Sequence, residues 1–505
     1  MTPQHSRGRH VAEDAVVDAV PAPLAAPPAD PATDPVTEPH VPGETGVPTE
    51  NAVPTEKPAV SMRRAMAFTT TTSMLVPVIG VVTAPVLARA LGVEGRGEVA
   101  TAMAPAALVA AVATLGLPEA LTYHLARRPD QTRRALVPAA LVSLLLGALC
   151  WGLSWAFASL LTKDDVQLIP IMLIGTALAL PQMLVGLLRG AAVGLQMWGA
   201  VAADRALSSL LRLVVLLALA LAGVLDVRVA VIAMSVIPVV TGVVYWKVLL
   251  RRPPAEAAAG ASAGGPPSSA SITRDVLSFG SSTWLGAVAS MATGRVAQLM
   301  TTPLSDATQL GLLVVAITIS DVLFILITAV RDTLFGVNAR FDDREQLMAI
   351  SRSALLVGAV GALVLGATVP LWIGPVFGAQ FAPATEPTWW LLIAAVTNIP
   401  GLMAGAGLGA WGRPGLRSAS FVVALVVLVG AFLLLVPTMG AVGAGLAAIA
   451  SGTAMSVFAV VLAARVNRSS PWAFVVPRGS DVVALGHEGA RLVRAVRARL
   501  PRRRS

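Results

Sequence analysis

The sequence has a single cysteine and very little charge. Cys150 lies in an apolar run, so a disulfide framework and a cysteine-rich metal site are both excluded. Charged residues make up 13% of the 505 positions, whereas a soluble globular domain carries roughly 25%. The chain therefore lacks the polar groups that would cover a water-exposed surface of this size.

Enzyme motifs are also missing. The sequence contains no GxxxxGK[ST] loop, no GxSxG elbow, no HExxH pair and no paired CxxC. Three of the five histidines, His5, His10 and His40, stand near the N-terminus, and the other two are isolated. We therefore predict a protein that is not an enzyme, with no catalytic residues, no metal site and no cofactor.

Apolar residues are abundant: 55% of the chain is hydrophobic, and the mean hydropathy is +0.75. Such a chain must place its apolar surface in a bilayer. The net charge of +9 comes from bases that stand between apolar runs, where they indicate membrane topology rather than nucleic-acid binding.

The apolar runs have the length of membrane-spanning helices, about 20 residues for ~30 Å of hydrocarbon. We predict an all-α integral membrane protein with about twelve spans in two halves of six. The predicted spans are 66–88, 99–121, 136–161, 168–188, 207–225, 229–250, 277–299, 310–331, 353–373, 388–409, 417–437 and 441–464.

The distribution of basic residues supports this count. With the N-terminus in the cytoplasm, all but five of the 37 lysines and arginines fall in cytoplasmic segments. The exceptions are Arg89, Arg96, Lys163 and Arg228 in outer loops, and Arg295 within a span. We therefore predict a multi-pass protein of the inner or plasma membrane with both termini cytoplasmic.

The spans and their connections define five regions. Residues 1–60 are proline-rich and too polar to pack, so we expect a disordered cytoplasmic tail. A six-helix lobe at 64–250 and another at 274–464 flank a flexible cytoplasmic linker, 251–273. The basic segment 465–505 is either a plain tail or an amphipathic helix on the anionic membrane surface.

Polar residues inside the spans are the candidates for a transport cavity, because ionisable groups are costly in hydrocarbon. The set comprises Arg295, Gln298, Asp321, Thr318, Asp204, Arg212 and Arg89.

Each candidate also has a structural alternative. Arg212 and Arg89 stand near span ends and can reach the headgroups. Asp204 can pair with Arg205 or Arg212, and Arg295 and Asp321 either neutralise each other or line the cavity.

The loop between the first two spans, LARALGVEGRGEVATA at 87–102, carries Leu91, Gly92, Gly95 and Gly97 in the pattern LG-x-x-x-x-G. Four less specific motifs follow at 186–196, 370–384, 409–417 and 436–447. The loop motif and these four segments, taken in chain order, resemble polysaccharide-biosynthesis flippases of the multidrug/oligosaccharidyl-lipid/polysaccharide exporter superfamily. The resemblance covers about residues 63–465.

One motif departs from that family. Many relatives carry Asn-Arg-x-Asp on the seventh helix, whereas this chain has Gly294, Arg295, Val296 and Ala297. The arginine matches and the aspartate does not, so no role of that aspartate transfers to this chain.

The resemblance implies a MATE-like flippase. Its substrate would be a polyprenyl-pyrophosphate-linked oligosaccharide or polysaccharide precursor, turned from the inner to the outer leaflet by alternating access. Its partners would be the lipid-linked glycan, membrane lipids and a polysaccharide polymerase or glycosyltransferases, with no nucleic acid. The alternatives are a small-molecule or drug antiporter that uses Asp321, and a peptidoglycan lipid-precursor flippase.

The topology can be tested with reporter fusions. Fusions in the loops at 127–134, 251–274 and 413–417 should report the cytoplasm, whereas those at 162–167 and 374–387 should report the outside. A reporter at 251–274 that reads outside would contradict the twelve-span arrangement.

Overall fold

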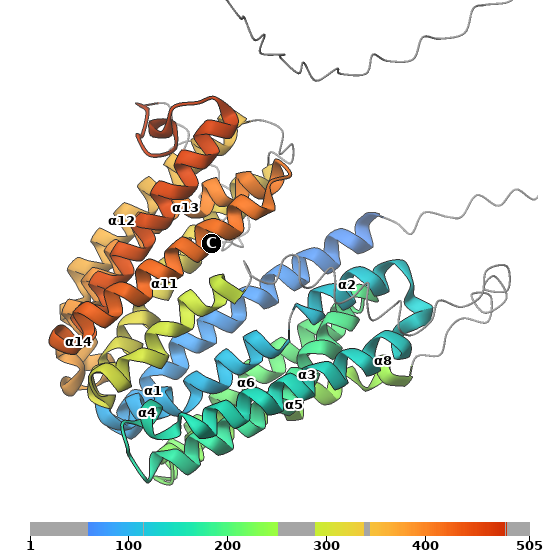
Figure 1. Ribbon diagram of the computed structural model, residues 1–505, viewed down its shortest axis with the longest axis vertical. Coiled ribbons are helices and arrows are strands. Elements are labelled where there is room, and N and C mark those ends of the chain that lie inside the picture. Colours follow the sequence, from blue (N-terminus) through green and yellow to red (C-terminus); the bar gives the residue numbers. More distant parts are fainter. Residues whose placement is uncertain (1–58, 115, 251–287, 338–343, 480, 482–505) are drawn as a thin grey trace, which may run out of the picture. The chain divides into compact units, whose positions relative to one another are not determined.

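The structure of the chain, a computed structural model, describes residues 59–114, 116–250, 288–337, 344–479 and 481. These residues are helical apart from short connections (Figure 1). The predicted N-terminal tail, the linker at 251–273 and the basic segment from Val482 onward lie outside the described residues. Below, "first half" means residues 59–250 and "second half" means residues 288–481.

The first half contains the helices that the sequence predicts and three short additional ones, α2, α4 and α8. In chain order they are α1 (Ala59–Ala113), α2 (Leu117–Arg127), α3 (Thr132–Ala156), α4 (Ala158–Thr162), α5 (Leu168–Gly194), α6 (Trp198–Leu221), α7 (Val227–Thr241) and α8 (Trp246–Leu250). The helices α3 and α5 run side by side (Figure 1).

The second half opens with a helix over residues 288–304. It continues with α11 (Ala307–Val337), α12 (Arg344–Phe377), α13 (Thr385–Ala410) and α14 (Pro414–Asn467), and the 3-10 turns η4 (Ala379–Ala384) and η5 (Pro471–Phe474). The most extensive helix packing in this half is that of α13 against α14; Figure 1 shows both helices.

Eight helices of the described part are long and apolar enough to cross a membrane. One of the eight lies within α1, which has 55 residues, and another is α14, which has 54 residues. A straight helix of this length would be about 80 Å long. Each bends once and so supplies two of the predicted spans. With α6 and the helix at 288–304, helical segments lie in the described part of each of the twelve predicted positions.

Both bends occur at glycines in the left-handed region of φ. Gly92 has φ 73° and Gly440 has φ 55°, a backbone conformation that disfavours any residue with a Cβ. A Cβ at Gly440 would also lie 2.4 Å from Oε1 of Gln309. That oxygen accepts a hydrogen bond from the Ala441 backbone N–H at 3.0 Å, so α11 supports the bend of α14.

The second predicted span is not one continuous helix. The second span was expected over 99–121, but α1 ends at Ala113 and α2 begins at Leu117. Gly116 adopts φ 69°, which ends helical geometry, and Pro118 suits the first turn of the new helix. Apolar residues continue through this break, so hydropathy alone could not reveal it.

The helix α1 contributes to the buried cores of both halves. Leu87, Val99 and Ala102 pack with residues of α5, α6 and α7. A second face of α1, which includes Ala88 and Ala100, packs with residues of α11, α12 and α14. Small side chains on this second face permit close helix–helix contact, as is common inside membranes.

The closest contact between the halves is the crossing of α1 and α11. A Cβ at Gly97 would lie 1.7 Å from the Ala307 carbonyl oxygen, and a Cβ at Gly311 would lie 2.0 Å from the Val93 carbonyl oxygen. The two glycines are thus reciprocal: each helix offers one glycine to the backbone of the other. No larger residue fits at either position without separating the helices.

Polar contacts surround this crossing. The Thr101 and Thr302 hydroxyls are buried and lie 2.6 Å apart, and Lys163 Nζ donates to the Ser305 carbonyl. All of these residues stand in or next to segments that the topology places on the outer side. The described hydrogen bonds between the halves therefore gather at the predicted outer end.

An ion pair between a buried carboxylate and a partly exposed guanidinium joins helices of the first half. Asp204 on α6 has no exposed surface and accepts hydrogen bonds from Arg189 Nε at 3.0 Å and Nη2 at 2.7 Å. The hydroxyls of Thr241 at 3.1 Å and Tyr245 at 2.9 Å also donate to its carboxylate. Because four donors satisfy the carboxylate, it can remain charged away from water.

A second ion pair fastens the chain after α14 to the start of α12. Arg352 donates to both carboxylate oxygens of Asp481, at 2.6 and 3.0 Å, and to the Ala473 carbonyl at 2.7 Å. The Arg352 guanidinium holds the pKa of the Asp481 carboxyl below its usual range. The pair is therefore fully charged at neutral pH, and its stabilisation is lost only as the pH falls through that lowered pKa.

The glycine crossing can be tested with Gly97→Ala. The added methyl group must push α1 from α11, and overpacking of this kind costs about 1–3 kcal/mol. In a Cys150→Ser background, a disulfide between Thr101→Cys and Thr302→Cys should form readily, and its yield should fall when Gly97→Ala is added.

The matched control is Gly186→Ala, because nothing lies within 4 Å of a Cβ built there. This variant should keep the wild-type melting temperature in detergent and the full disulfide yield. Equal yields for Gly97→Ala and Gly186→Ala would contradict the close crossing.

The Arg189–Asp204 pair of the first half can be tested with Asp204→Asn. This change removes the charge that Arg189 pairs with, but the Arg189 side chain is 37% exposed, so water can partly replace its partner. Hydrogen bonds to charged groups contribute about 1.5–3 kcal/mol, so the melting temperature and the folded yield should drop. Asp226→Asn is the control, because Asp226 is exposed and caps α7, a role that asparagine fills equally well. If the two variants melt alike, the network does not stabilise the first half.

Candidate functional site

The candidate residues fall into three places rather than one. Asp204 and Arg212 stand on α6, Arg89 lies just before the Gly92 bend, and the remaining four belong to the second half. The structure does not bring all seven together, so the environment of each place decides what it can contribute.

Asp204 is paired with Arg189, and not with either partner that the sequence suggested, Arg205 or Arg212. The prediction ended the fourth span at residue 188, whereas α5 continues to Gly194 and keeps Arg189 within the helix. Since its carboxylate is occupied by four donors, we assign Asp204 to the packing of the first half. Arg212 is half-buried, and the described residues supply no hydrogen-bond partner for it.

Arg89 links the halves. Its Nε donates to the Val376 carbonyl at 2.9 Å, and its Nη2 donates to the Pro375 carbonyl. Carbonyls at the end of α12 therefore hold the guanidinium beside the α1 bend. In this conformation, Arg89 belongs to the contacts of the predicted outer end.

Arg295 is exposed on the helix at 288–304. Its Nη1 lies 3.3 Å from Oε1 of Gln298 on the same helix. Asp321 is near enough for electrostatic attraction, but among the described residues no ion pair joins the two. The guanidinium thus keeps donors available for another group.

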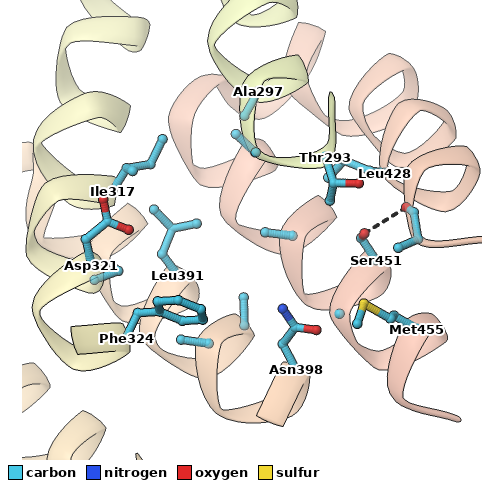
Figure 2. Close-up of a pocket in the computed structure, with 18 of the residues that line it drawn as sticks. Thr293, Ala297, Ile317, Asp321, Phe324, Leu391, Asn398, Leu428, Ser451 and Met455 are labelled. Atoms are coloured by element: carbon cyan, nitrogen blue, oxygen red, sulfur yellow. Dashed lines mark hydrogen bonds between the residues drawn. The ribbon is translucent and has the colours of Figure 1, made fainter. Parts of the chain in front are cut away.

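Asp321 lines a pocket of about 400 Å³ inside the second half (Figure 2). The pocket lies between α11, α13, α14 and the helix at 288–304, and most of its wall is apolar. Figure 2 shows Asp321, Ile317 and Phe324 on one side, with Asn398 and Met455 on the other. Arg295, Gln298 and Thr318 are not among its lining residues.

Two side chains of this pocket have unused polar atoms. The hydroxyls of Thr293, Ser320 and Ser451 donate to backbone carbonyls. Asn398 Oδ1 is buried without a hydrogen-bond partner, and no described residue donates a hydrogen bond to the Asp321 carboxylate.

An acid and an amide oxygen in an apolar pocket suit a proton or a small cation, and they repel a phosphate. An anionic substrate group would therefore bind outside this pocket.

Asn398 was not among the candidates from sequence, because an amide is common within a polytopic chain and no spacing distinguishes it. Only the fold of α13 against α11 places it opposite Asp321. Thr318, which was a candidate, donates to the Val314 carbonyl of its own helix at 2.8 Å, as membrane threonines often do.

The fold is shared with solved transporters. An inward-facing multidrug resistance MATE family transporter of the MOP superfamily is 14% identical, with a TM-score of 0.61 over 79% of this chain and 99% of that chain. The lipid II flippase MurJ in an inward closed conformation is 10% identical, with a TM-score of 0.63 over 80% of this chain and 88% of that chain.

A third solved structure is a MOP superfamily transporter from Pyrococcus furiosus, 16% identical, with a TM-score of 0.51 over 81% of this chain and 94% of that chain. At these identities, the likeness concerns the fold alone. No protein with a curated description matches the sequence.

The sequence itself matches one family. Residues 62–335 match the polysaccharide biosynthesis protein family, which is more than half of the chain and extends from the first helix into α11. Together with the fold, this match identifies a multi-pass membrane protein of the polysaccharide biosynthesis protein family.

Proposed function

We propose that this transporter moves a polyprenyl-pyrophosphate-linked saccharide from the inner to the outer leaflet. The proposal rests on the family match and on the requirements of such a substrate. Its pyrophosphate is anionic and its glycan is polar, so both need a water-filled or polar path between helices.

The observation that carries the proposal is the position of Arg295. Arg295 lies within the predicted span 277–299, and its side chain is exposed on the helix at 288–304. Among the described residues it forms no ion pair, and its guanidinium donates a hydrogen bond to Gln298. A guanidinium within a span is favourable if it faces a polar cavity or an anionic ligand.

The contacts between the halves support transport by alternating access. Arg89, Thr101 and Lys163 of the first half all contact the second half near the predicted outer end. With the halves packed there, a substrate would enter from the cytoplasmic side. Export would then require these contacts to break while the halves pack at the opposite end.

The pocket around Asp321 favours a second candidate, a cation-coupled antiporter of small molecules. Its unpaired carboxylate and amide oxygen suit a proton or sodium ion. This candidate predicts that Asp321→Asn abolishes efflux of hydrophobic cations and leaves surface glycans unchanged. A flippase for a peptidoglycan lipid precursor would instead show a defect in cell-wall synthesis.

Arg295→Ala tests the flippase proposal. The variant should insert normally and lose most export, so that lipid-linked saccharide accumulates on the cytoplasmic face, where a membrane-impermeant glycosidase detects it only in inverted vesicles. Asp321→Asn should not restore export to this variant. The control is Arg228→Ala, which removes an exposed arginine at the start of α7 and should export normally.

Two results would contradict the proposal. Normal saccharide export by Arg295→Ala at wild-type expression would remove Arg295 from the substrate path. A folding defect in both single variants that the double variant repairs would show that Arg295 and Asp321 neutralise each other instead.

A further inference from the structure

The chain after α14 forms an exposed turn of mixed apolar and basic character. The C-terminal turn, residues 468–478, exposes 70% of Trp472 and 51% of Val476. Arg468 and Arg478 at its two ends are exposed as well. The outward surface of the turn therefore combines apolar and basic side chains.

The C-terminal turn is held in place by buried contacts on its inner side. Phe474 is fully buried in a core that includes Leu347 of α12 and Leu408 of α13. Its carbonyl accepts a hydrogen bond from the Ser351 hydroxyl at 2.9 Å. The neighbouring Ala473 carbonyl accepts a hydrogen bond from Arg352, so the turn has one buried face and one outward face.

The turn also lies at the boundary of the membrane-spanning region. The last candidate span ends at Asn467, and the span of α12 begins at Glu345, a few residues from Ser351 and Arg352. The turn is therefore at the level where hydrocarbon gives way to headgroups. Tryptophan is enriched at this level, since its ring is apolar and its N–H is polar.

We propose that the C-terminal turn binds the headgroup layer of anionic phospholipids. Trp472 and Val476 enter the layer, and Arg468 and Arg478 contact lipid phosphates. The basic flanks favour an anionic lipid over a zwitterionic one, and the rigid attachment avoids the entropy of ordering a free tail. The turn lies within the basic segment 465–505, which the sequence assigns either to a plain tail or to an amphipathic helix on the anionic membrane surface.

The test uses the full chain reconstituted in nanodiscs. In a Cys150→Ser background, Val476→Cys is labelled with an environment-sensitive fluorophore, and quenching by a lipid with a shallow nitroxide is measured. One nanodisc contains phosphatidylcholine alone, and the other an equal mixture with phosphatidylglycerol. Quenching should be at least twofold stronger in the anionic mixture.

The arginines are tested with Arg468→Gln/Arg478→Gln, which should remove the gain from phosphatidylglycerol. The matched control, Arg134→Gln/Arg228→Gln, removes two exposed arginines of the first half and should keep the gain. Trp472→Ala should weaken quenching in both mixtures. Because these side chains are exposed, the variants should keep the wild-type melting temperature, which is measured in parallel.

Two outcomes would overturn the proposal. Absence of quenching in both mixtures would place the turn in water, and crosslinking of the Val476→Cys label to another protein in cells would then identify a protein surface instead. Equal quenching in both mixtures, unchanged by the arginine variants, would show burial in lipid without recognition of anionic headgroups.

Discussion

The close crossing of α1 and α11 is the constraint on which the arrangement of the two halves depends. Gly97 and Gly311 let each backbone approach the other to a distance that excludes a methyl group. In a bilayer, where apolar side chains gain little by leaving lipid, association comes mainly from such close packing and from polar contacts. The Thr101–Thr302 contact and the Arg89 hydrogen bonds add to a junction whose geometry the glycines determine.

Much of this fold follows from the sequence. Helix positions follow because the bilayer thickness and the helical rise set the length of each apolar run. Helices lie in the described part of every predicted span, although the second span is broken near Gly116. The bends at Gly92 and Gly440 fall in the predicted connections, yet the chain remains helical on both sides of each bend. The family match over residues 62–335 agrees with the loop motif around Gly92.

The partners of polar side chains could not be predicted, because they depend on which faces of distant helices meet. The sequence placed Arg189 in a loop and suggested that Asp204 pairs with an arginine of its own helix. In the fold, Arg189 lies on α5 and pairs with Asp204. Asn398 and Asp321 are 77 positions apart in the sequence and share a pocket only because α13 packs against α11. Hydropathy detects the cost of such groups in the membrane, but not what offsets that cost.

The sharing of α1 between two cores bears on how the protein is made. The sequence divides into two similar sets of spans, but the face of α1 with Ala84, Ala88 and Ala100 is buried by residues of the second set. During synthesis, that face has no protein to cover it until α11 has entered the membrane. The first half is therefore not a finished folding unit when its last helix is inserted, and its assembly is completed only by helices that the ribosome has yet to produce.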